Sequence, residues 1–211
     1  MSETFDKAYW DEHYDGHAPA GAGGPNPYLL AAARDLTPGT ALDAGCGEGA
    51  EAIWLAAHGW QVTAVDIADT ALHRAREHAA AAGVTTGIDW IQADLTTWTP
   101  AEERFGLVCS HYVHPAAAPG DLFRRLAAAV APGGTLLLVG HHPSDHHTAT
   151  TPEAHVEIGE LAAVLDPGRW DIAVAGDRSR VMSHGGREIP LHDTVLQARR
   201  RGQAAGGRLG R

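Results

Sequence analysis

Short apolar runs alternate with longer amphipathic runs along most of the chain, beginning at Thr40. The apolar runs predict strands, because a strand covered on both faces of a sheet is apolar throughout. These runs span residues 40–45, 60–66, 88–94, 104–113 and 135–142. Ala-rich runs with apolar residues at helical spacing predict helices over residues 48–59, 121–130 and 152–165, the last with Pro152 in its first turn. A further helix is predicted to begin at an N-cap residue, Asp69 or Thr70, and to end at Gly83.

The pattern changes over the last 40 residues. Two strand-like runs, residues 170–181 and 187–200, flank Ser183-His184-Gly185-Gly186, which is typical of a hairpin turn. Five β–α units followed by a hairpin predict a doubly wound α/β sheet of seven strands, mostly parallel with an antiparallel C-terminal hairpin. Ligand sites in such sheets lie at the carboxyl ends of the strands.

The chain length of 211 residues favours a single domain, which we place over residues 1–197. Residues 16–27 are rich in Gly and Pro, so we interpret residues 1–27 as an N-terminal lid segment with its linker and residues 28–197 as the core. Residues 198–211 hold five of the 16 basic residues and no acidic residue, and we expect them to form a disordered basic tail.

Composition excludes several classes of protein. Residues 1–197 hold the other 11 basic residues and all 26 acidic residues, whereas nucleic-acid binding needs a basic surface. No apolar run approaches 18 residues, and the polar, acidic N-terminus does not resemble a signal peptide. Two cysteines cannot form a disulfide framework. We therefore expect a cytoplasmic monomer or homodimer with no nucleic-acid or membrane partner.

A glycine-rich turn, LDAGCGEG at residues 42–49, joins the first predicted strand to the first predicted helix. Glycines at this position let a ligand approach the backbone. Gly45, Gly47 and Gly49 fit the spacing G-x-G-x-G, and Gly45 and Gly47 with Ala50 also fit the dinucleotide pattern G-x-G-x-x-A. The turn by itself is therefore compatible with a dinucleotide, with another ligand, or with a purely structural role.

Carboxylates at the ends of successive predicted strands favour a cationic ligand. Asp43 and Glu48 lie at the turn, and two carboxylates suit an ammonium and a sulfonium better than a pyrophosphate. Asp66 ends the second strand, where a carboxylate can accept both hydroxyls of a ribose, and Asp94 ends the third, placed to accept from an adenine amino group. Asp66 or Asp94 alone could equally be a cap or turn residue.

Taken together, these motifs resemble the class I S-adenosylmethionine-dependent methyltransferases, a family with a Rossmann-like fold, and in style its small-molecule members related to thiopurine and tellurite-resistance methyltransferases. LDAGCGEG is similar to the first motif of the family, VTAVDIA to the second and IQADL to the third. FGLVCSHYVH and APGGTLLLVG are similar to the fourth-strand region and to the helix–turn–strand after it. YWDEHY resembles the helix that many small members fold over the cofactor.

The resemblance implies S-adenosylmethionine as the cofactor. Asp43 and the turn amides would bind its methionine moiety, Asp66 its ribose, and Asp94 with Leu95 would flank its adenine. The implied cofactor residues are Asp43, Gly45, Cys46, Gly47, Gly49, Asp66, Ile67, Asp94, Leu95 and Ser110, with Trp10 and Tyr14 from the lid segment. The aromatic faces of Trp10 and Tyr14 can close over the sulfonium, or the two residues can simply fix the N-terminal helix.

Methyl transfer is an in-line displacement in which the protein supplies mainly orientation and a water-poor cavity. A thiolate or selenolate acceptor needs little more, whereas a hydroxyl or amine needs a general base. His111 and His114 are the candidate catalytic residues, and Tyr112, His141 and His142 are candidate substrate residues. His111 and His114 could instead cap loops or stack on the edges of the cofactor.

A histidine-rich segment, HHPSDHH at residues 141–147, resembles a metal-binding sequence. Pro143 prevents helical presentation of these histidines, no cysteine is nearby and the motif H-E-x-x-H is absent. We therefore expect a polar loop or site rim here, and no metal.

The sequence thus predicts an S-adenosylmethionine-dependent transfer of a methyl group to a small-molecule nucleophile, with S, Se or Te, O and N all open as the acceptor atom. One alternative is an NAD(P)-dependent oxidoreductase, although the chain has no Tyr-x-x-x-Lys pair and Lys7 is its only lysine. The other is a non-catalytic protein that binds S-adenosylmethionine, because no catalytic base is unmistakable.

Overall fold

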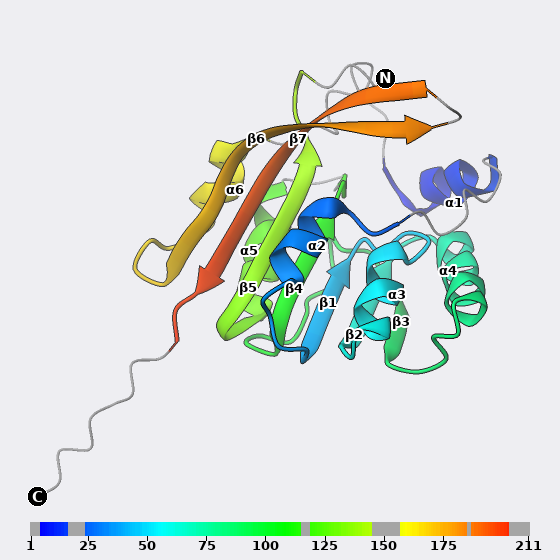
Figure 1. The fold of residues 1–211 in the computed structure, drawn as a ribbon, viewed down its shortest axis with the longest axis horizontal. Coiled ribbons are helices and arrows are strands. Elements are labelled where there is room, and N and C mark those ends of the chain that lie inside the picture. The colour runs from blue at the N-terminus through cyan, green and yellow to red at the C-terminus, as the bar shows by residue number, and fades with distance from the viewer. Residues whose placement is uncertain (1–4, 17–23, 115–118, 145–156, 185–186, 203–211) are drawn as a thin grey trace, which may run out of the picture.

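The computed structural model describes residues 5–16, 24–114, 119–144, 157–184 and 187–202. Seven strands form one sheet in the order β3-β2-β1-β4-β5-β7-β6 (Figure 1). They are β1 (Thr40–Ala44), β2 (Gln61–Asp66), β3 (Ile88–Gln92), β4 (Phe105–His111), β5 (Val130–His141), β6 (Trp170–His184) and β7 (Arg187–Arg200). The pairs among β1 to β5 are parallel, and β7 is antiparallel to both β5 and β6. The predicted doubly wound sheet with an antiparallel C-terminal hairpin is confirmed.

Six helices lie around this sheet in the described part of the chain: α1 (Lys7–Gly16), α2 (Pro27–Ala33), α3 (Ala50–Ala57), α4 (Asp69–Ala81), α5 (Pro119–Ala129) and α6 (Ile158–Ala163). Alternate residues of the central strands face opposite cores. Leu107 and Leu137 belong to the core that α2, α3 and α4 cover, whereas Val108 and Leu136 belong to the core that α5 and α6 cover. Each fully buried Leu contributes about 1.5–3 kcal/mol relative to an exposed one, so the two cores hold the strands at fixed positions.

Four β–α units, rather than the predicted five, precede the hairpin. Residues 93–104, which join β3 to β4, are all described and form only turns and irregular chain. This connection contains Pro100 and an Asp94-centred turn in place of an amphipathic run. Of the helix predicted over 152–165, Ile158–Ala163 is helical, and residues 152–156, including Pro152, lie outside the described residues.

The start of α4 differs from the prediction that Asp69 or Thr70 caps it. Ala68 is the N-cap residue, and it makes no side-chain cap. The carboxylate of Asp66, from the end of β2, accepts the Ala68 amide proton at 2.9 Å instead. A strand-end carboxylate therefore replaces the local side-chain cap that the sequence pattern suggested.

Helix α2 was not predicted, although its start follows standard capping rules. Pro27 occupies the first turn, and the Asn26 side-chain oxygen accepts the Tyr28 amide proton at 2.9 Å. Leu29 at its centre is fully buried. The seven-residue length of α2 leaves too short a periodic pattern to be recognised in the sequence.

The boundary predicted between the core and a basic tail is wrong by at least three residues. Strand β7 runs to Arg200, and Ala198 is fully buried. Arg200 is also buried and donates to the Val130 carbonyl and to Glu103. Residues 198–200 therefore belong to the sheet, while residues 203–211 lie outside the described residues.

Helix α1 forms within the predicted lid segment and lies beside α4, at the carboxyl ends of β1 and β2 (Figure 1). The hairpin of β6 and β7 extends beyond β5 over the same edge of the sheet (Figure 1). Among the described residues, no helix has the length and apolar character needed to cross a membrane.

Candidate functional site

The glycine turn lies where β1 meets α3, beside the point at which the strand order reverses between β1 and β4. Gly45, Gly47 and Gly49 all have positive φ, at 79°, 50° and 87°. A Cβ atom on Gly45 would lie 2.1 Å from Val113 Cγ2, and one on Gly47 would lie 2.9 Å from the Tyr14 hydroxyl. Both conformation and space therefore require glycine, and Tyr14 of the lid segment lies directly against the turn.

The backbone amides of this turn are largely paired within the protein. Those of Gly45 and Cys46 donate to the Val65 carbonyl at 2.8 and 3.0 Å, and that of Gly49 donates to the Cys46 carbonyl at 2.8 Å. The Gly47 amide donates to Asp66 Oδ2 at 2.8 Å. The resemblance implied that the turn amides bind the methionine moiety. In this structure these four amides support the turn itself, so its glycines act through their lack of side chains.

Asp43 at the end of β1 is 1% exposed, and its Oδ2 has no hydrogen-bond partner among the described residues. Burial raises its pKa well above the usual range, and the charges of Glu51 and Asp66 raise it further. Burial also raises the pKa of Asp66. We call Asp43, Glu51 and Asp66 the acidic cluster. Their mutual repulsion in a buried place favours occupancy by a cation.

Glu51, rather than the predicted Glu48, is the second carboxylate beside Asp43. Glu48 forms an ion pair with Arg74 of α4 at 2.8 Å, so its charge is already balanced. Glu51 lies in the first turn of α3 and accepts the Asn26 amide proton at 2.9 Å. Glu48 was predicted as the second carboxylate because it lies inside the glycine turn, but its side chain extends toward α4.

Asp66 and its neighbour Ile67 lie at the end of β2. The two carboxylate oxygens of Asp66 accept the amides of Gly47 and Ala68, and each oxygen keeps a further lone pair. Ile67 is half-buried, and its carbonyl accepts from the Gln92 side chain at 3.3 Å. Asp66 therefore joins β2, the glycine turn and α4 while retaining the capacity to accept ligand hydroxyls.

Asp94 forms a turn after β3. Its Oδ1 accepts the Thr96 amide at 2.8 Å and the Thr96 hydroxyl at 2.7 Å. Leu95 is 8% exposed, and its Cδ1 would lie 3.9 Å from a Cβ on Gly45, which places it beside the glycine turn. Asp94 thus has the turn-forming role that the sequence left open, and its contact with adenine stays a prediction.

Ser110 and Cys46, two further predicted cofactor residues, are buried. The Ser110 hydroxyl donates to the Ala44 carbonyl at 2.9 Å and thereby ties β4 to β1. Burial raises the pKa of the Cys46 thiol well above its usual range, so the thiol stays protonated. These two side chains support the strand ends and the turn.

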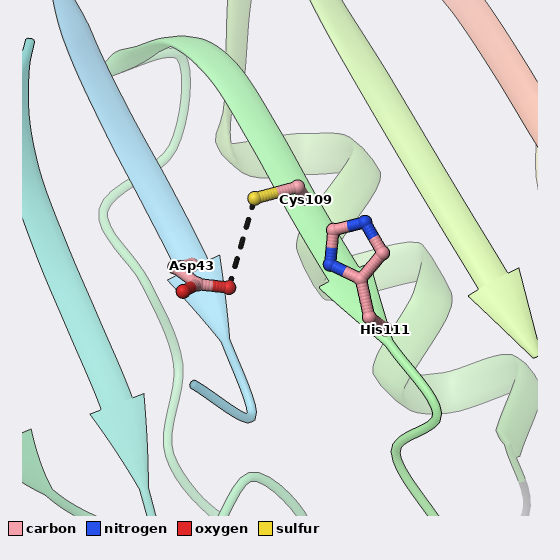
Figure 2. A group of neighbouring side chains, drawn as sticks. All are labelled: Asp43, Cys109 and His111. Atoms are coloured by element: carbon pink, nitrogen blue, oxygen red, sulfur yellow. Dashed lines mark hydrogen bonds between the residues drawn. The ribbon is translucent and has the colours of Figure 1, made fainter. Parts of the chain in front are cut away.

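His111 lies beside the acidic cluster. Asp43, Cys109 and His111 each offer one metal-binding type of atom within 4.8 Å of the others (Figure 2). Cys109 Sγ lies 3.7 Å from Asp43 Oδ1, and burial raises the pKa of Cys109 and of Asp43, which favours the protonated forms of both.

The imidazole of His111 is suited to accept a proton. Its Nε2 is buried and has no hydrogen-bond partner among the described residues. Burial lowers its pKa, and the positive charge of Arg180 also lowers it, although Glu51 acts in the opposite direction. A neutral imidazole with a free nitrogen is therefore present beside the acidic cluster at neutral pH.

A row of rings connects the lid segment to the end of β4. Trp10 stacks on His114 with centroids 5.8 Å apart, His114 stacks on His141 at 5.6 Å, and His141 lies 4.5 Å from the ring of Tyr112. We call these four residues the aromatic row. The structure thus brings together predicted lid, catalytic and substrate residues from three separate segments.

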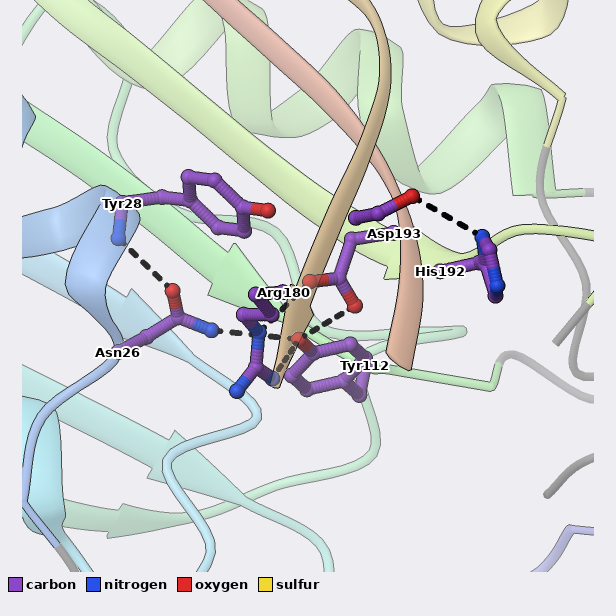
Figure 3. Close-up of polar contacts among 7 residues, drawn as sticks. Asn26, Tyr28, Tyr112, Arg180, His192 and Asp193 are labelled. Carbon is purple, nitrogen blue, oxygen red and sulfur yellow. Dashed lines mark hydrogen bonds and ion pairs between the residues drawn. The ribbon is translucent and has the colours of Figure 1, made fainter. Parts of the chain in front are cut away.

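The hydroxyl of Tyr112 is fully engaged with the protein (Figure 3). It donates to Asp193 Oδ1 at 2.8 Å and accepts from Arg180 Nη2 at 2.7 Å. The amide of Asn26 lies 3.4 Å away. Tyr112 has a φ of 54°, which is unusual for a residue with a side chain, and these contacts hold it there. Its predicted contact with a substrate stays a prediction.

His142, another predicted substrate residue, is bound to the hairpin. Its Nδ1 lies 2.8 Å from the Ser144 hydroxyl and its Nε2 lies 3.4 Å from Asp177 of β6. Its backbone amide donates to the His192 carbonyl at 3.0 Å. His142 therefore fastens the end of β5 to β6 and β7.

Four residues of the site were missed in the sequence: Asn26, Glu51, Arg180 and Asp193. The cap signal of Asn26 before Pro27 was readable. Arg180 and Asp193 gave no signal, because their pairing depends on how the hairpin strands register and where the hairpin crosses the end of β4.

Comparison with known proteins finds methyltransferases that are similar to the chain. A family model described as a methyltransferase domain matches residues 41–134. A 2-heptyl-1-hydroxyquinolin-4(1H)-one methyltransferase of Mycobacteroides abscessus is 30% identical over 66% of this chain and 64% of its own length. A probable thiol methyltransferase of Arabidopsis thaliana is 29% identical over 75% of this chain and 71% of its own length.

A solved structure from work on conversion of a disulfide bond into a thioacetal group during echinomycin biosynthesis also matches. Its TM-score is 0.70 with 25% identity, and the match covers 94% of both chains. The match to this chain spans 33% of the length of one curated relative and 64% of the length of the hydroxyquinolone methyltransferase. These matches do not favour the nicotinamide alternative.

Proposed function

We propose that the chain is a class I S-adenosylmethionine-dependent methyltransferase that transfers the cofactor's methyl group to a small-molecule nucleophile. Its similarity to known methyltransferases supports this proposal, and the acidic cluster carries it. Asp43 has a buried carboxylate oxygen without a hydrogen-bond partner among the described residues, and Glu51 and Asp66 lie nearby, which fits a ligand that carries an ammonium and a sulfonium. The donor set of the chain therefore fits S-adenosylmethionine.

Each part of the cofactor has a candidate partner at the carboxyl end of the sheet. Asp43 and Glu51 would hold the positively charged methionine end, and the remaining lone pairs of Asp66 would accept the ribose hydroxyls. Asp94 and Leu95 lie at the end of β3 for the adenine. The cofactor, when bound, supplies the electrophilic methyl group and the leaving thioether.

His111 is the residue that we propose as the proton acceptor. Its free Nε2 and lowered pKa make it neutral but weakly basic at neutral pH. A weak base deprotonates acidic groups most effectively, so we infer that the acceptor is a thiol or an acidic hydroxyl rather than an alkyl amine or simple alcohol. The curated relatives include proteins named as thiol and hydroxyquinolone methyltransferases, which agrees with this class.

The lid segment and the aromatic row would exclude water from the transfer. Tyr14 lies against Gly47, and Trp10 stacks on His114, so α1 covers the site from the side opposite the sheet. Water exclusion matters because a solvated nucleophile attacks a sulfonium slowly. His114 and His141 then form the wall between the lid and β5.

The test is a methylation screen with S-adenosylmethionine labelled in its methyl group. The panel contains thiols, selenols, phenols, alkyl amines, alcohols and carboxylic acids, and products are identified by mass. We expect label transfer to thiols or acidic hydroxyls, and at least about a hundredfold loss of kcat in His111→Ala. His58→Ala, at an exposed histidine of α3's C-cap, is the control. Cofactor binding without transfer to any class would instead support a non-catalytic binding protein.

A further inference from the structure

The guanidinium of Arg180 forms two hydrogen bonds to the protein, through its Nε and Nη2 atoms. Its Nε donates to Asp193 Oδ2 at 2.7 Å, and its Nη2 donates to the Tyr112 hydroxyl at 2.7 Å. Asp193 is fully buried in β7, and Tyr112 is fixed at the end of β4. These contacts fix the plane of the guanidinium, so its orientation does not depend on a ligand (Figure 3).

The other edge of the same guanidinium is unused. Arginine has five N–H donors, and the two bonds above use two of them. No further hydrogen bond of Arg180 is present among the described residues, and its side chain is 22% exposed. The Nη1–Nη2 edge, which faces away from Asp193, therefore offers a planar pair of donors to whatever occupies the neighbouring space.

This edge lies on the acceptor side of the proposed site. Tyr112, whose hydroxyl accepts from Arg180, is the end of the aromatic row that continues through His141 and His114 to Trp10. Arg180 is also near enough to His111 for its charge to affect that imidazole. A molecule whose nucleophilic atom is near His111 can therefore extend a second group to Arg180.

The negative charge of the chain indicates what the unused edge of Arg180 can bind. The chain has a formal charge of −10, and the side chains of Asp43 and Glu51 lie near His111. An anionic acceptor would be repelled unless a preorganised cation received it. The ion pair with Asp193 balances the charge of Arg180, which stabilises its half-buried guanidinium.

We propose that the Nη1–Nη2 edge of Arg180 binds a carboxylate on the methyl acceptor, so that the acceptor is a small organic acid that also carries the nucleophilic group. This inference rests on the proposed function and specifies its substrate class. Arg180 would determine specificity, and Asp193 and Tyr112 would position it. The fork geometry of a guanidinium matches the two oxygens of a carboxylate, which an amide or ester cannot reproduce.

The experiment measures binding of matched acids and amides by calorimetry. The full chain is first saturated with S-adenosylhomocysteine, whose binding heat reports separately on the proposed function. The probes are 3-mercaptopropionate with 3-mercaptopropionamide, and 3-mercaptobenzoate with 3-mercaptobenzamide. We expect at least one acid to bind at least tenfold more tightly than its amide.

Variants separate recognition from a purely structural role. Arg180→Gln should remove the preference for the acid by weakening acid binding tenfold or more, and leave the affinity for the amide and for S-adenosylhomocysteine unchanged. Arg180→Lys keeps the charge next to Asp193, which protects folding, but lacks the fork and should lose most of the preference. Arg178→Gln is the control, because Arg178 is exposed on the same strand and, within the part of the chain that the structure describes, its side chain donates only to the Asp177 carbonyl, at 2.9 Å.

Three results would overturn the inference while the proposed function stands. These are equal binding of acid and amide, no binding of any probe to the protein saturated with S-adenosylhomocysteine, and an equal loss of acid and amide binding in Arg180→Lys. Failure of S-adenosylhomocysteine to bind would instead reject the proposed function itself.

Discussion

The carboxylate of Asp66 accepts the amide proton of Gly47 at 2.8 Å, across 19 residues of sequence. Its other oxygen accepts the amide of Ala68 at 2.9 Å. One side chain at the end of β2 thus sets the glycine turn after β1 and the start of α4. The same side chain is the candidate ribose acceptor, so the geometry of the turn and the binding of the cofactor depend on a common residue.

Replacing Asp66 with Ala should weaken binding of S-adenosylhomocysteine by more than tenfold. The change leaves two ribose hydroxyls and the Gly47 amide without their acceptor, and each lost charged hydrogen bond costs about 1.5–3 kcal/mol. Isothermal calorimetry measures the dissociation constant. Asp89→Ala, an exposed carboxylate on the neighbouring strand β3, should have no effect. An unchanged affinity in Asp66→Ala would refute the ribose assignment.

Gly45→Ala should destabilise the protein far more than Gly83→Ala. Both glycines have similar positive φ values, 79° and 74°, so each substitution costs about 1–2 kcal/mol in backbone strain. Only Gly45 is crowded, since its new Cβ would lie 2.1 Å from Val113 Cγ2, whereas nothing lies within 4 Å at Gly83. The crowding adds about 1–3 kcal/mol, measurable by urea denaturation. Equal losses would show that Val113 moves freely away from the turn.

The rate of methyl transfer should fall at acidic pH. Burial lowers the pKa of His111 below the usual value of about 6.5, so the imidazole is neutral at neutral pH and gains a proton only as the pH falls through that lowered value. The value of kcat/KM should therefore increase as the pH rises from the acidic range, and it should reach a plateau before pH 7. His111→Gln should remove this rise, and His58→Gln should keep it. A profile that keeps the same acidic limb in His111→Gln would exclude His111 as the base.

Asp43→Asn should stabilise the cofactor-free protein at neutral pH by a margin that grows with pH. Burial raises the folded-state pKa of Asp43, so the folded state holds the proton more tightly than the unfolded state. The stability from this group is complete below the unfolded pKa and is lost as pH rises through the folded pKa. Asparagine cannot ionise and avoids that loss.

Urea denaturation of the wild type and Asp43→Asn over a range of pH measures the difference. Asp89→Asn serves as the control, because Asp89 is exposed. A difference in unfolding free energy that does not change with pH would contradict the raised pKa. The same substitution should weaken cofactor binding, since an amide cannot ionise to pair with the ammonium of the cofactor.

The sequence was sufficient for the strands and the glycine turn, because burial on both faces makes the strands apolar and positive φ requires glycine. It was insufficient at two connections beside these strands. The Ala68 amide at the start of α4 donates to Asp66, two residues earlier at the end of β2, and not to the predicted capping side chains. The chain after β3 forms turns, so four of the five predicted β–α units are present, and the five-residue strand before it did not indicate this.

The residues of the candidate site likewise divide into those that the sequence could predict and those that it could not. Asp43, Asp66 and His111 were predictable, because residues at the ends of parallel strands meet at one edge of a sheet. Arg180 and Asp193 were not predictable, since they come from a hairpin whose crossing over β4 depends on tertiary packing. Tyr112 was predicted as a substrate residue from its place after the fourth strand, which did not reveal that its hydroxyl is bonded to these two residues.

Binding of S-adenosylmethionine, measured by isothermal calorimetry on the full chain, tests the central claim most directly. We predict a one-to-one complex at micromolar or lower dissociation constant for S-adenosylmethionine and for S-adenosylhomocysteine, with no comparable heat for NADH or NADPH. Absence of binding by both sulfur-containing compounds would contradict the account.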